Sequence, residues 1–268
     1  MDANLKARLL TGFVGIPLLV FLIGWGDPWL FHGFCLLVTF GALHEYFSMA
    51  FPGRPGEQII GIAFGLAVSS IVFFPQLTPV ELILAPLLVL MLSIYIFMDG
   101  QLEERLARLA WALLGSLYLG YLLPHWSSLF RLPHGRAWVF FVLVVVMAGD
   151  TCAYFVGRRL GRKKLAPEIS PGKTVEGAIG YVLGSILAGC LTGISLALGL
   201  NGWELALLSA LLSILGQLGD LFESWIKRVF TVKDSGRLLP GHGGLLDRLD
   251  SLIFPAVFTT TYLKVFHP

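Results

Sequence analysis

The sequence predicts an all-α, polytopic integral membrane protein with about nine transmembrane helices and a cytoplasmic N-terminus. Of its 268 residues, 56% are hydrophobic and only 13% are charged, and the mean hydropathy is +0.79. A soluble domain usually carries about 25% charged residues. A chain with so little polar surface cannot cover a core that faces water, so lipid must solvate most of it.

Nine apolar stretches approach the length of a membrane-crossing helix, which needs about 20 residues. Short turns marked by Gly and Pro, such as Gly26-Asp27-Pro28 and Phe51-Pro52-Gly53, separate several of them. The expected spans are 9–25, 29–50, 59–75, 80–98, 109–123, 138–157, 176–198, 203–224 and 251–266.

Lysine and arginine residues are distributed unevenly between the two sides of this arrangement. With a cytoplasmic N-terminus, sixteen of the 19 lie in inner segments, and only Arg131, Arg136 and Lys264 lie in outer ones. Cytoplasmic segments of membrane proteins are enriched in positive residues. The distribution therefore favours an odd number of spans, with the N-terminus inside and the C-terminus outside.

The chain is interpreted as a single membrane domain, 1–268, with two functionally different halves. Residues 1–135 form a helical scaffold and residues 136–268 form a catalytic half. Two connections in the second half, 158–175 and 225–250, are longer, more basic and richer in glycine than the others. Both are expected on the cytoplasmic side.

The eighth span carries polar residues at helical spacing. Asp220, Glu223, Ser224 and Lys227 are three or four residues apart, so they share one helical face. An acidic residue at the centre of a span is unfavourable by about 2.5–3.5 kcal/mol, so this face should contact protein or a water-filled cavity. Alternatively, the two carboxylates lie near the interface, where this penalty is small.

The segment 233–250 combines glycines with charged residues. Its glycines allow backbone N–H groups to approach an anion, and Lys233 and Arg248 add positive charge. Asp247 and Asp250, at the start of the last helix, are expected on one face. Convergent carboxylates beside phosphate-binding groups commonly hold Mg²⁺. The alternative for Asp250 is a helix N-terminal residue favoured by the macrodipole.

Two further elements precede these residues. Asp150 lies about two turns from the end of the sixth span, where a charged residue is a functional candidate or a structural partner of a nearby cation. Ser170, Lys173 and Thr174 lead into the seventh span and predict an anion site at a helix start. Pro167 stands where a Walker A motif requires glycine. The alternative is a basic loop that binds anionic lipid headgroups.

These carboxylates come from three expected helices, all near the cytoplasmic side. The spacing therefore predicts a site for a metal ion and a nucleotide at the membrane boundary, facing the cytoplasm. In the second span, His44 and Glu45 are interpreted as a structural pair rather than as part of this site.

The segment 224–250 resembles the signature of the phosphatidate cytidylyltransferases, or CDP-diacylglycerol synthases. The family pattern is S-x-apolar-K-R, four residues, K-D, and later H-G-G-apolar-x-D-R-apolar-D. It is matched here by Ser224, Lys227, Arg228, Lys233, Asp234, His242, Gly243, Gly244, Asp247, Arg248 and Asp250. Upstream, Asp150-Thr151, Ser170-Pro171, Lys173-Thr174 and Glu176-Gly177 also resemble the family, whereas Gly172 stands where a second lysine is frequent.

The resemblance implies a helical membrane enzyme, often a homodimer, that converts CTP and phosphatidate to CDP-diacylglycerol and pyrophosphate. Mg²⁺ is the expected cofactor, and a second cation is left open. Asp220 and Asp247 are the first choices as metal ligands, and Asp250, Glu223 and Asp150 are the second choices. A bacterial inner membrane is the expected location, and no nucleic acid is expected as a partner.

The remaining site residues are assigned by the same resemblance. The catalytic set is completed by Lys227, Arg228, His242 and Arg248. The expected substrate-binding residues are Ser170, Lys173, Thr174, Glu176, Ser224, Lys233, Asp234, Gly243 and Gly244. The alternatives are a CTP-dependent polyprenol or phytol kinase, against which the complete signature argues, and a transporter, against which the one-sided polar residues argue.

Overall fold

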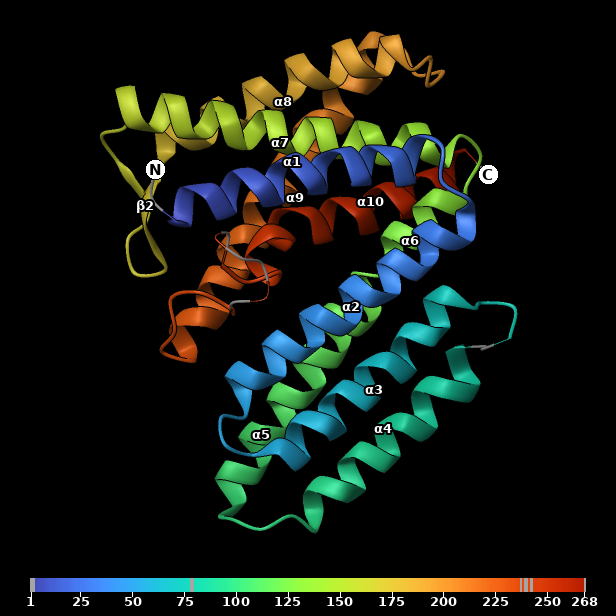
Figure 1. Ribbon diagram of the computed structural model, residues 1–268, viewed down its shortest axis with the longest axis vertical. Helices are drawn as coiled ribbons and strands as arrows, with labels where there is room; N and C mark the ends of the chain where they lie inside the picture. Colours follow the sequence, from blue (N-terminus) through green and yellow to red (C-terminus); the bar gives the residue numbers. More distant parts are fainter. Residues whose placement is uncertain (1–2, 78–79, 237, 239–240, 242, 268) are drawn as a thin grey trace. The chain divides into compact units, whose positions relative to one another are not determined.

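The computed structural model describes residues 3–77, 80–236, 238, 241 and 243–267 (Figure 1). Helices dominate these residues. In the N-terminal part they are α1 Ala3–Gly24, α2 Pro28–Ala50, α3 Pro55–Phe73, α4 Val80–Ile96, α5 Leu102–Gly115, the π-helix η1 Ser116–Leu122 and α6 His125–Arg131. They continue with α7 Gly135–Leu160, α8 Val175–Ser195, α9 Gly202–Val229, the 3₁₀-helix η2 Leu246–Arg248 and α10 Asp250–Phe266.

Each expected span coincides with a helix, although five of them extend one to three residues past the observed helix end, and the fifth continues from α5 into the π-helix η1. In the described part of the chain, six helices are long and apolar enough to cross a membrane. They are Pro28–Ala50, Pro55–Phe73, Leu102–Arg131, Gly135–Leu160, Val175–Ser195 and Gly202–Val229. The chain is therefore a helical protein with several helices that could span a membrane, and the count of nine stays a prediction.

Side-chain caps fix where several of these helices begin, α2 and α9 among them. The Asp27 carboxylate accepts a hydrogen bond from the Trp29 backbone N–H at 2.9 Å, and Pro28 occupies the first turn of α2. At α9, Asn201 and Glu204 form a reciprocal capping box with two 2.9 Å hydrogen bonds. These contacts satisfy backbone donors that a helix N-terminus otherwise leaves unpaired.

The purely helical prediction needs one correction. The expected loop 158–175 contains an antiparallel pair of strands, β1 Lys164–Ala166 and β2 Ser170–Thr174, with Lys164 opposite Thr174 and Ala166 opposite Ser170. Three residues beginning with Pro167 connect them, and a connection of this length closes a hairpin. Lys173 and Thr174 end β2, and Thr174 is also the N-cap of α8, so the Gly-Lys-Thr sequence leads directly into this helix as expected.

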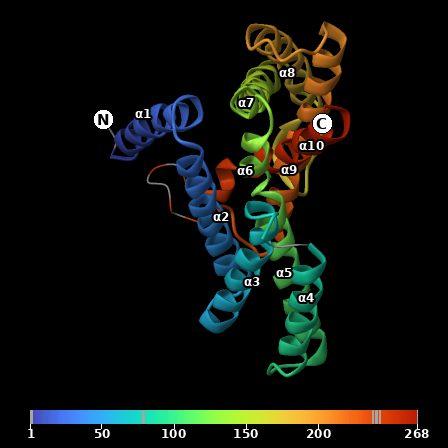
Figure 2. The same ribbon diagram turned by 90° about the vertical axis from the view of Figure 1, so that its right-hand side faces the viewer.

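The chain divides into two compact units. Unit 1 contains Met1–Ser128 and Asp234–Leu246, and unit 2 contains Leu129–Lys233 and Asp247–Pro268. In unit 1, α3 packs against α2, α4 and η1 (Figures 1 and 2). Its core includes Leu43, Tyr46 and Phe47, which are fully buried, and the Tyr46 hydroxyl donates to the Trp111 carbonyl at 3.0 Å. The expected division of one membrane domain at residue 135 stays a prediction.

In unit 2, α7 packs lengthwise against α8, α8 against α9, and α9 against α10 (Figure 1). Gly219 permits the close approach of the last two helices, because a Cβ atom there would lie 2.3 Å from the Asp250 carbonyl oxygen. This contact sets the N-terminus of α10 beside the polar face of α9.

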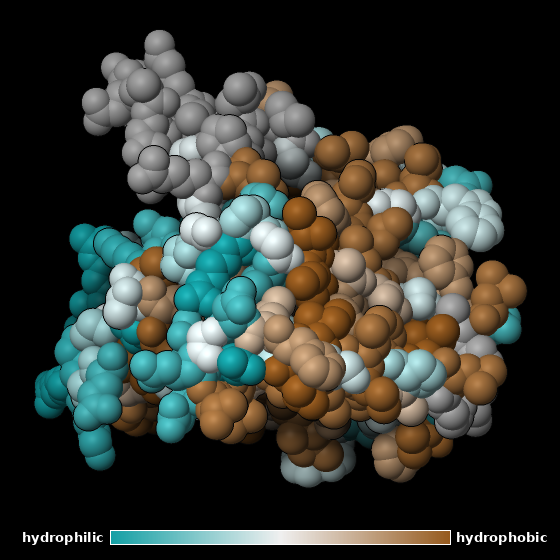
Figure 3. Space-filling view, turned by 90° about the horizontal axis from the view of Figure 1, so that it is seen from below, coloured by the Kyte–Doolittle hydropathy of each residue, from teal (hydrophilic) through white to brown (hydrophobic). Residues whose placement is uncertain are grey.

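Large apolar side chains remain exposed on the helices, and hydrophobic residues are prominent on the surface in Figure 3. On α8, Leu183, Leu187 and Leu191 are spaced by four residues and are each more than 60% exposed. Such a stripe would be unfavourable in water and is typical of a helix that could cross a membrane.

Candidate active site

The polar face predicted on α9 is present, and its residues are paired. The Lys227 ammonium lies 2.5 Å from a Glu223 carboxylate oxygen and donates to Asp247 Oδ1 at 2.6 Å. The Glu223 side chain is 0% exposed, and the Lys227 side chain is 11% exposed. One lysine therefore bridges two carboxylates, one from α9 and one from the turn before α10.

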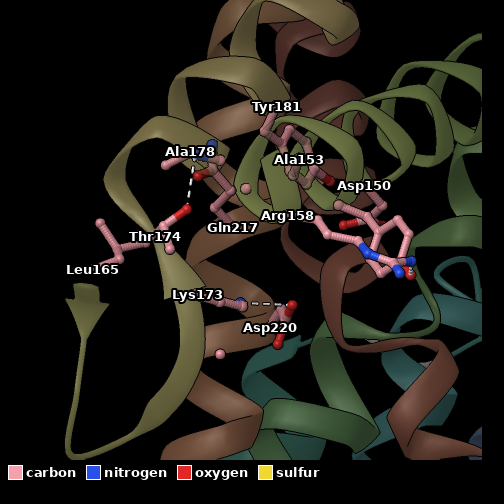
Figure 4. A pocket seen from close by; sticks show the side chains of 14 residues that line it. Asp150, Ala153, Arg158, Leu165, Lys173, Thr174, Ala178, Tyr181, Gln217 and Asp220 are labelled. Atoms are coloured by element: carbon pink, nitrogen blue, oxygen red, sulfur yellow. Dashed lines mark hydrogen bonds and ion pairs between the residues drawn. The ribbon is translucent and has the colours of Figure 1, made fainter. Parts of the chain in front are cut away.

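One turn earlier on α9, Asp220 lines a cavity of about 430 Å³ formed by α7, β2, α8 and α9 (Figure 4). The Lys173 ammonium, which comes from β2, lies 2.6 Å from Asp220 Oδ2. Asp150, Tyr181 and Gln217 also line the cavity. Lys173 and Asp220 are partly exposed, by 25% and 29% of their side chains, so a soluble ligand can reach both.

Further carboxylates surround Asp220. Asp150 accepts a 3.4 Å hydrogen bond from the Ser251 hydroxyl, and Asp250 accepts one of 2.7 Å from the Ser251 backbone N–H. Burial and the negative charge of Asp220 raise the pKa of Asp250, which begins α10. The carboxylates thus repel one another, and a bound cation would relieve this repulsion.

Several residues that the sequence predicts to be in the site hold the β1–β2 hairpin against its neighbours. The Thr174 hydroxyl accepts a 3.1 Å hydrogen bond from the Gly177 N–H and caps α8. Glu176 accepts from the backbone N–H groups of Arg162 and Lys163 at 3.0 and 3.3 Å. Arg228 donates to the Ile169 carbonyl at 3.3 Å. In this structure these groups hold the strand that presents Lys173.

The other expected site residues occupy varied positions. Ser224 donates to Asp220 at 3.4 Å, and Ser170 begins β2. Lys233, Asp234 and Arg248 are exposed. Gly243 adopts a φ of 85°, Gly244 is buried, and His242 lies outside the described residues. Asp247 is on η2 rather than on the last helix, so it does not share a helical face with Asp250 as expected.

The structure also gives Glu45 partners that the sequence does not predict. Its carboxylate accepts from the Ser235 hydroxyl at 3.0 Å and from the Leu246 backbone N–H at 2.9 Å. The sequence signal was an acidic residue in an apolar span, which is a functional candidate by default. We expected a structural pair with His44, whereas Glu45 contacts Ser235 and Leu246 instead.

The donor set fits a divalent cation that also binds substrate oxygens. Among the strongest electrostatic interactions of Asp150, Glu223 and Asp250 are the repulsion by neighbouring carboxylates and the attraction of Lys173 and Lys227. Within the described residues, no three Asp, Glu, His or Cys side chains converge to form a complete metal site. Mg²⁺ characteristically takes one or two protein carboxylates and completes its shell with phosphate oxygens and water.

Comparison with known proteins places these features in a family. The model of the Cytidylyltransferase family matches residues 6–266. The chain belongs to this family. It is 34% identical to the phosphatidate cytidylyltransferase of Bacillus subtilis (strain 168) over 276 residues, covering 98% of this chain and 99% of that protein.

Other relatives match mainly over part of their length. The phosphatidate cytidylyltransferase of Brucella suis biovar 1 is 48% identical over 134 residues, which are 50% of this chain and 49% of that protein. That of Staphylococcus epidermidis (strain ATCC 12228) is 51% identical over 120 residues, 45% of this chain and 46% of that protein. The chain thus spans about half the length of the Brucella and Staphylococcus relatives in these alignments.

Proposed function

We propose that the chain is a phosphatidate cytidylyltransferase, which makes CDP-diacylglycerol and pyrophosphate from CTP and phosphatidate. The observation that carries this proposal is the similarity to the Bacillus subtilis enzyme over 98% of the chain. The cavity that Lys173 and Asp220 line supports it, because a nucleoside triphosphate needs a cationic group beside a site for a divalent cation.

In the proposed reaction, an oxygen of the phosphatidate phosphate attacks the α-phosphorus of CTP. A new phosphorus–oxygen bond forms to the lipid phosphate. The bond between the α-phosphorus and the oxygen that bridges to the β-phosphate breaks, and pyrophosphate leaves with the electron pair. A phosphate monoester is already ionised at neutral pH, so the chain needs no strong general base. His242 is therefore assigned to phosphate or loop contacts rather than to proton abstraction.

Basic side chains would offset the charge on the reacting phosphates. Lys173 lines the cavity, and Lys227 lies between Glu223 and Asp247. Both ammonium groups are now paired with carboxylates, so substrate phosphates would compete for them. Arg228, Lys233 and Arg248 are exposed and are assigned to the phosphates of CTP or of the lipid. The substrate-binding set also keeps Ser170, Thr174, Glu176, Ser224, Asp234, Gly243 and Gly244.

Asp220 and Asp247 are the residues that would hold Mg²⁺, with Asp250, Glu223 and Asp150 as further candidates. Bound Mg²⁺ supplies Lewis-acid stabilisation of charge on phosphate oxygens. The repulsion that Glu223 and Asp250 experience from neighbouring aspartates supports this assignment. A titration of the protein with Mg²⁺ would show whether a second cation binds.

Finer features of the proposal concern the membrane. We assign nine spans, a cytoplasmic N-terminus, a site facing the cytoplasm, a bacterial inner membrane and a homodimer. The distribution of Lys and Arg supports the orientation, and the exposed leucines of α8 support contact with lipid. The diacyl chains would then enter the site sideways from the bilayer.

Substitution of the two aspartates tests the site. Asp220→Asn and Asp247→Asn should each reduce Mg²⁺-dependent release of pyrophosphate by at least about 100-fold, because each loses a charged ligand. Glu103→Gln, at an exposed position of α5, is the matched control and should retain activity. Membrane insertion and yield show whether each variant folds. Near-normal turnover in either aspartate variant would refute its assignment.

A further inference from the structure

A buried carboxylate in α2 has no part in the mechanism above. Glu45 is only 4% exposed, and it lies on an apolar helix of unit 1. A buried carboxylate is unfavourable unless hydrogen bonds or a cation compensate it. Here the compensation comes from Ser235 Oγ at 3.0 Å and from the Leu246 backbone N–H at 2.9 Å. These donors come from the two ends of the glycine-rich loop, defined as Ser235–Leu246.

Two glycines allow the ends of the loop to close around this carboxylate. A Cβ atom at Gly236 would lie 2.4 Å from Glu45 Oε1, and one at Gly244 would lie 2.8 Å from Oε2. A Cβ at Gly244 would also lie 1.8 Å from Ser235 Oγ. Since real Cβ atoms do not tolerate such distances, neither glycine can be replaced without moving the loop or the carboxylate.

The anchored loop carries residues already assigned to the proposed reaction. Gly243 and Gly244 are next to each other in it, and Gly243 has a φ of 85°, which disfavours other residues. Leu246, whose N–H is held by Glu45, directly precedes Asp247 in the chain. A contact with Glu45 therefore constrains the backbone one residue before a proposed metal ligand.

We propose that Glu45 is a positioning residue, which holds the two described ends of the loop, 235–236 and 243–246, so that the backbone at Gly243 and Gly244 is placed to bind the phosphates of the nucleotide. The choice of ligand rests on the function proposed above, whereas the anchoring itself rests on the contacts within unit 1. Glu45 acts through the loop and does not contact the substrate. Its loss should therefore weaken nucleotide binding more than it slows the chemical step.

Steady-state kinetics with purified full-length protein tests this role. Glu45→Ala should raise the KM for CTP by about tenfold, with kcat changed less than about threefold, because a misplaced loop binds phosphate poorly. Glu45→Gln keeps an acceptor oxygen and should recover part of the loss. A fall in kcat and in thermal stability with an unchanged KM would indicate a purely structural role and would overturn the proposal.

A double-mutant cycle uses the steric relationship between Gly236 and Glu45. The three atoms nearest to a Cβ at Gly236 all belong to Glu45, so Gly236→Ala should disturb the loop through this carboxylate. Once Glu45→Ala has removed it, adding Gly236→Ala should raise the KM for CTP little further. Fully additive effects would mean that the two residues act independently, against the proposal.

Limited trypsin digestion reports on the loop without reference to catalysis. Trypsin can cleave after Lys233, which is exposed and lies two residues before the loop begins. Glu45→Ala should accelerate cleavage between 233 and 248, and Glu103→Gln, the same control as above, should not. Unchanged cleavage in Glu45→Ala would overturn the anchoring. If Glu45→Ala were cleaved faster but the wild-type protein never turned over CTP, the proposed function would be refuted and the anchoring would stand.

Discussion

Lys227 is a nearly buried lysine that pairs with two carboxylates. It lies against Glu223, whose side chain is 0% exposed, and against Asp247. Removing one partner of a buried ion pair leaves an uncompensated charge. Lys227→Met should therefore lower the free energy of unfolding by about 3–5 kcal/mol, measured by denaturant titration in detergent.

Two further variants complete that prediction. Lys233→Met removes a lysine that is exposed to solvent and should change stability little. Glu223→Gln combined with Lys227→Met removes both charges of the pair and should recover much of the lost stability. If Lys227→Met were as stable as the wild type, the buried pair would not have the role described here.

Helical periodicity predicts residue contacts only within a helix. It correctly places Asp220, Glu223 and Lys227 on one face of α9, because spacings of three and four are local. It says nothing of Glu45 and Ser235, which are 190 residues apart in sequence and meet only after the chain folds. The pairing of Lys173 with Asp220 depends in the same way on how β2 and α9 pack.

The β1–β2 hairpin is the element that presents Lys173 to the cavity. Glu176 holds the backbone before β1 through the N–H groups of Arg162 and Lys163. Glu176→Ala should release this segment and raise the KM for CTP by about tenfold, because Lys173 is no longer held in place. Glu176→Gln should have a smaller effect. An unchanged KM for Glu176→Ala would show that the hairpin does not position the lysine.

The contact between α9 and α10 depends on Gly219. A Cβ there would lie 2.3 Å from the Asp250 carbonyl oxygen, so Gly219→Ala should destabilise the protein by about 1–3 kcal/mol, as overpacking usually does. Gly202→Ala is the matched control on the same helix, since nothing lies within 4 Å of its Cβ position. Equal stabilities for the two variants in detergent denaturation would contradict the close approach.

The long helices could be predicted from the sequence, whereas the short strands β1 and β2 and the 3₁₀-helix η2 could not. Runs of about 20 apolar residues give a strong signal, and each expected span is helical. The strands of three and five residues in 158–175 lack an alternating apolar pattern, so sequence alone indicates a loop. Asp247 was misplaced for a related reason, because a turn of 3₁₀-helix has no signature of its own.

At the scale of the whole molecule, hydropathy predicts a membrane protein, but topology rests on the distribution of charge. Six helices of the described part meet the criteria for a span, and the segments Gly15–Gly24 and Leu82–Ile96 are apolar but shorter. Length and composition therefore do not decide between six and nine crossings. The orientation is predicted from the distribution of Lys and Arg.

Cysteine labelling in inverted and right-side-out vesicles would measure this topology. In a variant without Cys35, Cys152 and Cys190, a cysteine introduced by Gly172→Cys should react only from the cytoplasmic side. One introduced by Gln76→Cys should react only from the opposite side. Both positions are exposed, so access to the thiol is not limited by packing. Labelling of both from the same side would contradict the nine-span arrangement.

The central claim is that this membrane protein joins CTP to phosphatidate. The most direct test is to incubate the purified protein with CTP labelled in the cytosine ring, with and without phosphatidate and Mg²⁺, and to measure pyrophosphate and labelled lipid together. We predict that CDP-diacylglycerol and pyrophosphate appear in equal amounts, and only when all three components are present. Phosphorylation of a lipid alcohol by CTP without any CDP-lipid, or no reaction of CTP under any of these conditions, would contradict the account.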